Sequence, residues 1–230
     1  MPKKPREPRI ERISARNGLT AWVVDGSWVR KNIDEEFSNY GHHFTYHEIP
    51  KSELWLDSET DPDERKFYLK RMRREYRLRE KGVDEETARN RANVYERKLR
   101  MEAGDLRKAK QDHDLPQPTA VHDRLWKALS NGTKVWFVKG RLVRSVYDIE
   151  FTEGGHEHVY EFIPRDEVWI DNDVHRDEQG YVLFHELHER NLMADGKDYD
   201  TAHEESSRLE RYYRNHPAEL HEALKKEGWE

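Results

Sequence analysis

The chain has 230 residues, of which 38% are charged and 34% hydrophobic, and its formal net charge is -6. Because it has no cysteine, disulfides, thiol nucleophiles and thiolate metal sites are excluded. Its 7 Trp, 11 Tyr and 7 Phe supply large side chains for a core, which predicts a folded protein rather than a disordered one. No apolar run is long enough for a membrane helix, and the basic start lacks the apolar centre of a signal peptide, so we expect a cytoplasmic location.

The first half of the chain is predicted to contain β-strands followed by two helices. Residues 22–37 and 49–57 are rich in the β-branched and aromatic residues that favour strands. The first helix opens at an Asp-Pro dipeptide and ends at Gly82, which suits the left-handed position after a helix. Asp84 is the predicted cap of the second helix, which is expected to run to about Lys110.

The second half is predicted to repeat this order. Residues 135–151, 156–164 and 167–171 are the strand candidates, the sequence TEGG after the first indicates a turn, and Pro164 marks a break before the last. A helix then begins near Asp177 and ends at Gly196, and Asp198 caps the next helix.

The two halves are related in sequence. A shift of 114 positions places WVVDGSWVRKNIDEEF over WFVKGRLVRSVYDIEF, and about 27 of the 77 residues from Trp22 to Lys98 are identical to their partners without a gap. We therefore predict an α+β protein, a tandem duplication of a small antiparallel sheet followed by an antiparallel helical hairpin. The predicted parts are a basic tail, a first module, a linker with a short helix, a second module and a C-terminal helix, at residues 1–19, 20–110, 111–132, 133–215 and 216–230.

Several side chains of the strand segments have predicted positions. Trp55 and Trp169 are expected in the core. His42 and His156 are expected at hairpin turns, with local hydrogen bonds rather than metal ligation. Acidic residues that alternate with apolar ones are expected to face water, and they are Glu53, Asp57, Glu167 and Asp171.

The helical hairpin of the second module is predicted to form a metal site. At about 100° per residue, His185 and Glu189 lie on one stripe of the first helix. If the second helix runs antiparallel, His203 comes level with Glu189, and Glu210 comes level with His185. Two imidazoles and two carboxylates suit a divalent ion such as zinc, manganese or iron. The alternative is that these are polar residues of half-exposed helix faces.

The same positions of the first module hold no histidine. His185 and His203 are replaced there by arginines, whereas both glutamates remain glutamates. The guanidinium groups would supply the positive charge that an ion supplies in the other module, so we predict a salt-bridge cluster. Its members are Arg71, Glu75, Arg89 and Glu96.

A stretch of about 40 residues in the second module resembles a known family. The strand EVWID, the acidic helix start RDE and the helix sequence YVLFHEL are similar to the strand and active-site helix of zincin-type metallopeptidases. The resemblance is to the small antirepressor-cleaving kind found beside mobile elements. It spans residues 167–210 and implies a zinc-dependent peptidase.

The family pattern carries over residue by residue. His185 would bind zinc, Glu186 would be the general base that activates water, and His203 would be the ligand from the following helix. Glu189 stands where the family has its second histidine, and His188, one position earlier, is the alternative ligand. Glu186 is Met72 in the first module, as expected if only one module is catalytic; the alternative is that Glu186 is a solvated charge.

Two function classes follow. The first is a metal-dependent hydrolase of the zincin-like peptidase type, acting on a protein or peptide, with its site in the second module. The second is a non-catalytic viral or mobile-element protein whose hairpin is held by a metal ion or a polar network. Residues 64–82 carry nine basic residues and with the basic tail could contact nucleic acid, but we expect a solvated face with internal ion pairs. No membrane partner is expected.

Overall fold

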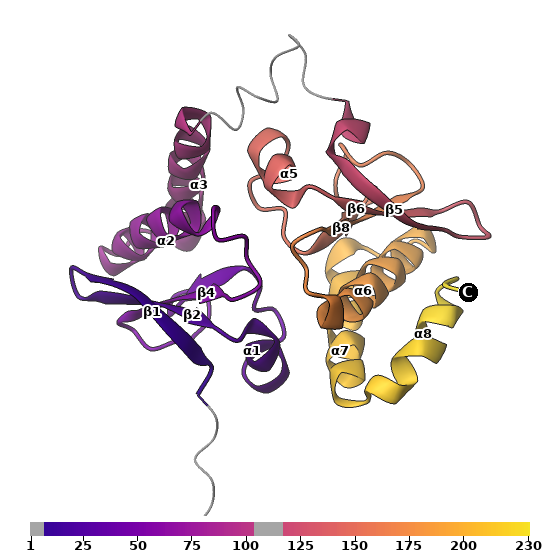
Figure 1. The fold of residues 1–230 in the computed structure, drawn as a ribbon, viewed down its shortest axis with the longest axis horizontal. Helices are drawn as coiled ribbons and strands as arrows, with labels where there is room; N and C mark the ends of the chain where they lie inside the picture. The colour runs from indigo at the N-terminus through magenta and orange to yellow at the C-terminus, as the bar shows by residue number, and fades with distance from the viewer. Residues whose placement is uncertain (1–6, 104–116) are drawn as a thin grey trace, which may run out of the picture. The chain divides into compact units, whose positions relative to one another are not determined.

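The computed structural model describes residues 7–103 and 117–230. The protein is α+β, and its chain divides into two compact units, Met1–Glu96 and Arg97–Glu230. In each half of the chain, a four-stranded sheet is followed by two long helices (Figure 1). The predicted fold class and the repetition of one architecture are confirmed.

The elements follow the same order twice. The first half contains β1 (Arg9–Arg16), β2 (Leu19–Val24), α1 (Gly26–Asn32), β3 (Tyr40–His42), β4 (Glu53–Asp57), α2 (Arg65–Glu80) and α3 (Glu85–Glu102). The second half contains η1 (Pro118–Val121), β5 (His122–Ala128), β6 (Lys134–Val138), α5 (Gly140–Val146), β7 (Gly154–His156), β8 (Glu167–Asp171), α6 (Arg176–Ala194), α7 (Tyr199–Asn215), η2 (Pro217–Glu219) and α8 (Leu220–Lys226).

Both sheets are mixed rather than purely antiparallel as predicted. Their strand orders are β1-β2-β4-β3 and β5-β6-β8-β7. The two central strands of each sheet are parallel, with Trp22 opposite Trp55 in the first sheet and Trp136 opposite Trp169 in the second. A parallel pair needs a long crossover connection, and α1 and α5 lie in those connections.

Side chains of the central strands alternate between two buried faces. Leu54 and Leu56 of β4 pack in one cluster with Met72 of α2. Trp55 points to the other face of the sheet, where it packs in a cluster with residues of α1. Trp169 is fully buried at the equivalent position, so the prediction that both tryptophans are core residues is confirmed.

Residues 9–16 and 122–128 form the strands β1 and β5, so the predicted tail and short helix are wrong there. Each strand joins the next through an Asn-Gly turn. Asn17 and Gly18 have φ angles of 52° and 79°, and Gly132 has a φ of 94°. Asn-Gly is a strong hairpin signal. The strands were nevertheless not predicted, because the side chains of β1 and β5 are exposed or half-buried and lack the apolar alternation of a core strand.

The long strand predicted at the start of each module is also wrong, and so is the strand predicted at 156–164, where only His156 belongs to a strand. The chain leaves β2 and β6 after a few residues and turns into the short helices α1 and α5. Asp25 caps α1 by accepting a hydrogen bond from the backbone N–H of Trp28 at 3.0 Å. Gly140 is the first residue of α5 and lies against Asp171 of β8. A Cβ atom at this position would lie 2.0 Å from Asp171 Oδ2, so a glycine fits there without a clash.

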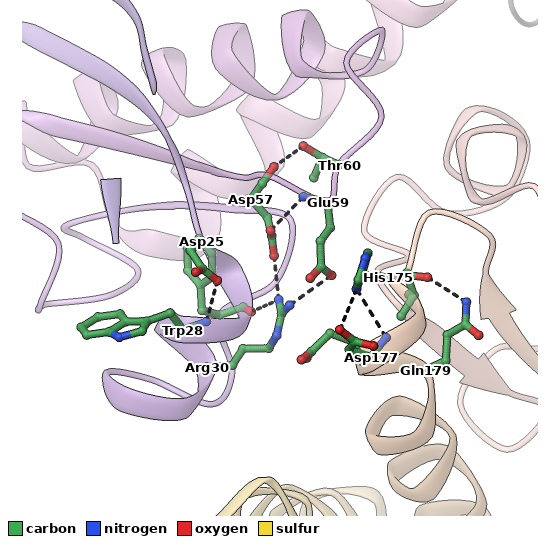
Figure 2. A network of polar contacts seen from close by, with 12 residues as sticks. Asp25, Trp28, Arg30, Asp57, Glu59, Thr60, His175, Asp177 and Gln179 are labelled. Atoms are coloured by element: carbon green, nitrogen blue, oxygen red, sulfur yellow. Dashed lines mark hydrogen bonds and ion pairs between the residues drawn. The ribbon is translucent and has the colours of Figure 1, made fainter. Parts of the chain in front are cut away.

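Asp57 and Asp171 are each only 2% exposed, although their alternation with apolar residues predicted that they face water. Arg30 Nη1 donates to Asp57 Oδ2 at 2.7 Å, and Figure 2 shows the same guanidinium reaching Glu59. In the second unit, Arg144 Nη1 donates to Asp171 Oδ2 at 2.5 Å. The prediction failed because each arginine partner lies 27 residues away in sequence and is itself buried.

The long helices agree with the predicted ones within a few residues. Asp84 and Asp198 accept hydrogen bonds from the backbone of α3 and α7, and Gly82 and Gly196 have φ angles of 78° and 97°. The structure describes α3 to Glu102, and its predicted continuation lies outside the described residues.

The second unit extends beyond its predicted boundaries. Residues 111–116 of the predicted linker lie outside the described residues, whereas η1 and β5 belong to the second unit. At the other end, Ala223 and Leu224 of α8 join the core cluster that contains Leu187 of α6. Within the described residues, no helix combines the length and hydropathy needed to cross a membrane.

Candidate metal centre

The helices α6 and α7 form the antiparallel pair that the metal-site prediction requires. Glu189, near the end of α6, contacts His203 near the start of α7, whereas His185 contacts Glu210 one turn or more further along. The turn between the helices is set by Gly196 and by the capping residue Asp198. The four predicted ligands therefore lie close together.

The carboxylate of Glu189 is at the centre of the site. Its Oε2 atom lies 2.7 Å from His203 Nδ1 and 3.4 Å from His185 Nε2. Its Oε1 atom lies 3.0 Å from Nε2 of a third imidazole, His156. His185 Nε2 and His203 Nδ1 are 3.3 Å apart, so three potential ligand atoms surround one point.

These separations can be compared with the geometry of a bound ion. A tetrahedral ion with bonds of about 2.0 to 2.1 Å holds its ligand atoms roughly 3.3 Å apart. His185 lies at 3.3 and 3.4 Å from the other two ligands and fits this value. The 2.7 Å contact between His203 and Glu189 is a hydrogen bond that must open by about half an ångström to admit an ion. The site fits a borderline divalent ion with nitrogen and oxygen ligands.

Glu210 occupies a different position from the one predicted. Its Oε2 atom lies 2.9 Å from Nδ1 of His185, on the side of the imidazole opposite Glu189. Its other oxygen accepts from Arg214 Nη2 at 2.6 Å, and Arg214 in turn contacts Glu178. Glu210 therefore does not face the ion position, and it orients His185 as carboxylates commonly orient ligating histidines.

Charge in the site is balanced among buried groups. Burial by itself would lower the pKa of His185, but its contacts with Glu189 and Glu210 outweigh burial and raise the pKa well above its ordinary value. Burial would raise the pKa of Glu189, but hydrogen bonds from His156, His185 and His203 lower it well below its ordinary value. Glu189 is therefore an ionised carboxylate surrounded by imidazoles.

Glu186 lies beside this site and differs from its neighbours. It is 9% exposed, and no hydrogen bond or salt bridge joins it to any other residue in the part of the chain that the structure describes. Burial raises its pKa to about 8. One oxygen each of Glu186 and Glu189 and a ring nitrogen of His156 lie within 4.8 Å of one another.

The space for the Glu186 carboxylate comes from a glycine. A Cβ atom added to Gly154 of β7 would lie 2.7 Å from Glu186 Oε1. In the first unit, Tyr40 stands at the position of Gly154 and Met72 at the position of Glu186. A large side chain thus replaces the glycine, and an apolar side chain replaces the carboxylate. Both positions differ between the two units, and this joint change is a sequence signal that the residues contact each other. The α6 motif by itself does not contain this signal.

His156 belongs to the cluster around Glu189, although the sequence analysis did not place it there. The expected local hydrogen bond is present, because the backbone N–H of His158 donates to His156 Nδ1 at 3.3 Å. His156 also ends strand β7, is fully buried and contacts Glu189, which was not predicted. The sequence signal that could have identified His156 is the Gly-His pair, which is kept in both modules at 41–42 and 155–156. His188, by contrast, lies away from the site. Its Nδ1 atom is 2.9 Å from Glu227 Oε1, and its ring stacks on Phe184, so it joins α6 to the C-terminal segment.

The first unit contains a related cluster without the metal ligands. Arg71 Nη1 lies 3.2 Å from Glu75 Oε2, and Arg71 Nε lies 3.5 Å from Glu96 Oε2. The same nitrogen donates to Asn93 Oδ1 at 2.9 Å. These contacts agree with the predicted salt-bridge cluster, in which a guanidinium occupies the place of His185.

Arg89 does not belong to that cluster, although it was predicted there. It is exposed and pairs with Glu85 at 2.5 Å in the first turn of α3. A local partner four residues away holds its long side chain outward. His42 is the member that was not predicted, and its Nε2 atom lies 4.0 Å from Glu75 Oε1.

The imidazole of His42 is expected to titrate with a midpoint near pH 4. Burial, reinforced by the nearby charge of Arg71, lowers the pKa of His42 to about 4, while the Glu75 carboxylate that would oppose this is paired with Arg71. The unfolded chain takes up this proton below about pH 6.5, before the folded one does, so the free energy of unfolding of the first unit falls between pH 6.5 and 4.

Histidine NMR of the folded protein measures this midpoint directly. The pH dependence of unfolding provides a second measurement, since in His42→Gln the decrease in the free energy of unfolding between those pH values should be smaller by on the order of 3 kcal/mol. A midpoint near 6.5 for His42 in the folded state would contradict the assignment.

The chain shows no match to a known protein family, to a curated protein or to a solved structure. Its function is therefore inferred from the geometry and chemistry of the site.

Proposed function

We propose that the second unit is a metal-dependent hydrolase of the zincin-like peptidase type, with His185, Glu189 and His203 as ligands of a zinc ion. Glu186 is the general base. The observation that carries this proposal is the buried Glu186 carboxylate, which has no hydrogen-bond or salt-bridge partner within the described residues and lies beside three potential ligand atoms. A buried carboxylate without a partner costs stability, which favours a role in chemistry over one in packing.

The residues present suit this chemistry. A bound zinc ion supplies a Lewis acid that polarises the scissile carbonyl and lowers the pKa of water. With a carboxylate among its ligands, the site is less electrophilic than one with three histidines, a departure from the family pattern that favours activated or unstructured substrates. His156 and Glu210 are not ligands in this assignment. They hold Glu189 and His185 in place.

Glu186 carries the proton transfers. Burial favours the neutral form of Glu186, and a zinc ion at the neighbouring ligands would favour the ionised form that a base requires. As water adds to the carbonyl carbon of the substrate, the ionised Glu186 carboxylate takes its proton. The carbon–nitrogen bond then breaks as Glu186 returns that proton to the leaving nitrogen. Gly154 is the residue that leaves room for the carboxylate, and a larger residue there is incompatible with its position.

A substrate has access to the site from the side of α7. The His203 side chain is 35% exposed, whereas that of His185 is only 12% exposed. Tyr199, an exposed residue, stacks on the His203 ring with a centroid distance of 5.3 Å. An aromatic side chain at the open edge of the site can contact the apolar side chains of a peptide.

The proposal is tested with zinc-loaded protein and an unstructured, fluorescently quenched peptide library. Glu186→Gln is expected to reduce kcat by about 100-fold or more while zinc binding is retained. Glu204→Gln is the matched control, because Glu204 is exposed on α7 and is expected to leave kcat unchanged. Absence of hydrolysis by the wild type, or full activity in Glu186→Gln, would refute the peptidase assignment.

A second candidate is a non-catalytic viral or mobile-element protein whose hairpin is held by this site. It is favoured by the contacts of Glu189 with three imidazoles, which join α6 to α7 and to β7. Under this candidate Glu186→Met, which restores the residue of the first unit, keeps the partner interaction and raises the melting temperature. The hydrolase requires instead that Glu186→Met abolish turnover.

A further inference from the structure

The first unit contains a groove lined by positive charge. Its volume is about 430 Å³, and it lies between α2, the turn that joins β1 to β2, and α3. Tyr95 of α3 also lines it, and no acidic residue does. The cations of this basic groove are Arg16, Lys70, Arg73, Arg74, Arg77 and Lys81.

These six cations have no carboxylate partners. Within the described residues, no salt bridge joins any of them to an acidic side chain. Arg73 Nη2 donates to the Ser14 hydroxyl at 2.6 Å, but its buried Nε atom has no partner. Burial and the neighbouring charges of Arg16 and Arg77 lower the pKa of Arg73. The groove therefore concentrates positive charge that the described part of the protein leaves uncompensated.

The second unit has different residues at the equivalent positions. At the positions of Lys70, Arg73 and Arg74 it has Phe184, Leu187 and His188. Phe184 and Leu187 pack in one core cluster with Ala223 and Leu224 of α8, and His188 contacts Glu227. That surface is thus apolar and covered, whereas the first unit has cations at the same positions.

The counterpart of α8 in the repeat, residues 106–112, lies outside the described residues. In sequence, residues 106–112 carry three basic residues against one acidic residue. The two units also differ in their balance of basic and acidic residues. Residues 1–96 carry 20 Lys and Arg against 19 Asp and Glu, and residues 97–230 carry 21 against 28. The positive surface is thus a local feature of the first unit.

The shape of the charged row favours an extended polyanion. Four of the cations lie on α2 and Lys81 directly follows it, so the row runs from Lys70 to Lys81, which at about 1.5 Å per residue spans roughly 16 Å. A nucleic-acid strand presents a phosphate about every 3.4 Å along its helix axis, so the row matches four or five phosphates. A single phosphate ion would leave most of these cations without a partner.

An aromatic side chain lies beside the row. The guanidinium of Arg74 is 5.1 Å from the centroid of the half-buried Tyr95 ring. Aromatic rings next to backbone-binding cations are typical of surfaces on which nucleic-acid bases stack, and an acidic peptide has no comparable use for the ring. We propose that the basic groove binds the sugar-phosphate backbone of a nucleic acid without sequence preference, as a function separate from the hydrolase site.

Fluorescence anisotropy of the full chain with labelled single-stranded and double-stranded oligonucleotides tests this proposal. We expect binding at 50 mM salt with log Kd rising with log salt at a slope of about 3 to 4, as four or five phosphate contacts predict. The triple variant Lys70→Gln, Arg74→Gln, Arg77→Gln should lose at least tenfold in affinity and reduce the slope by two or more. Its melting temperature should change little, because the relief of repulsion offsets the loss of the hydrogen bond from Arg74 Nε to the Arg91 carbonyl.

The matched control removes three exposed lysines elsewhere, in Lys31→Gln, Lys51→Gln, Lys98→Gln, and is expected to change the affinity less than twofold. The relative affinities for single and double strands identify the preferred form. The proposal is overturned if the wild type does not bind at 50 mM salt, or if both triple variants lose affinity equally. It is also overturned if poly-glutamate or inorganic triphosphate competes as well as the oligonucleotide at equal charge concentration.

Discussion

Zinc at 100 times its Kd is expected to raise the free energy of unfolding of the second unit by about 2.7 kcal/mol, and His185→Ala and His203→Ala are expected to abolish the increase. The ion binds the folded site, where the ligand atoms of His185, Glu189 and His203 lie 2.7 to 3.4 Å apart, but has no such site in the unfolded chain. For a unit of this size, the melting temperature should rise by roughly 5 to 10 °C.

The measurement compares chelator-treated protein with and without zinc, by thermal unfolding and by elemental analysis of bound metal. His188→Ala is the matched control. His188 lies on the same helix as the ligands but contacts Glu227, so this variant should retain the stabilisation and one ion per chain. If zinc and manganese both leave the wild-type melting temperature unchanged, the metal site is refuted. Retention of the effect in His203→Ala would show that the ligands are assigned wrongly.

The second large effect is expected at the buried ion pair between α5 and β8. Asp171→Asn should destabilise the second unit by about 3 to 5 kcal/mol, because the buried guanidinium of Arg144 loses its buried counterion at 2.5 Å and keeps only the longer ion pair with the more exposed Asp173 at 3.7 Å. Gly140→Ala should destabilise the same unit, since the added Cβ atom would lie 2.0 Å from the Asp171 carboxylate. Calorimetric or denaturant unfolding of each variant measures these changes.

The duplication provides an internal comparison for this prediction. Asp57→Asn should destabilise the first unit to a similar extent, because Arg30 is equally buried there. Asp123→Asn removes a charge at an exposed position of β5 and should change stability by less than about 0.5 kcal/mol. Equal stabilities of Asp171→Asn and Asp123→Asn would show that the pair makes no net contribution.

Helix-level features of this protein could be predicted from its sequence alone. The repeat, the helical hairpins and the caps at Asp84 and Asp198 all depend on residues within a few positions of one another. The same is true of the proximity of His185 and Glu189, because residues four apart on a helix are neighbours. Once the short turn made α7 antiparallel to α6, His203 had to lie near Glu189.

The strands were predicted less well because their signals are weaker. The Asn-Gly turns that follow β1 and β5 are visible in the sequence. The strands themselves have exposed or half-buried side chains, so they lack the apolar alternation by which a strand is predicted. The acids of β4 and β8 alternate with apolar residues as surface acids do. Only the distant arginines that pair with Asp57 and Asp171 show that these acids are buried.

Contacts between distant elements were decided by the tertiary structure. It brings His156 of β7 to Glu189, directs Glu210 to the outer nitrogen of His185, and turns Arg89 toward solvent. The contacts of His156 and Glu210 depend on the depth and direction from which two elements approach one another, whereas Arg89 pairs locally with Glu85 four residues away on the same helix. The sequence by itself determined which side chains share a helix face, and the packing of sheet on helix decided which of them meet the partners that make a site.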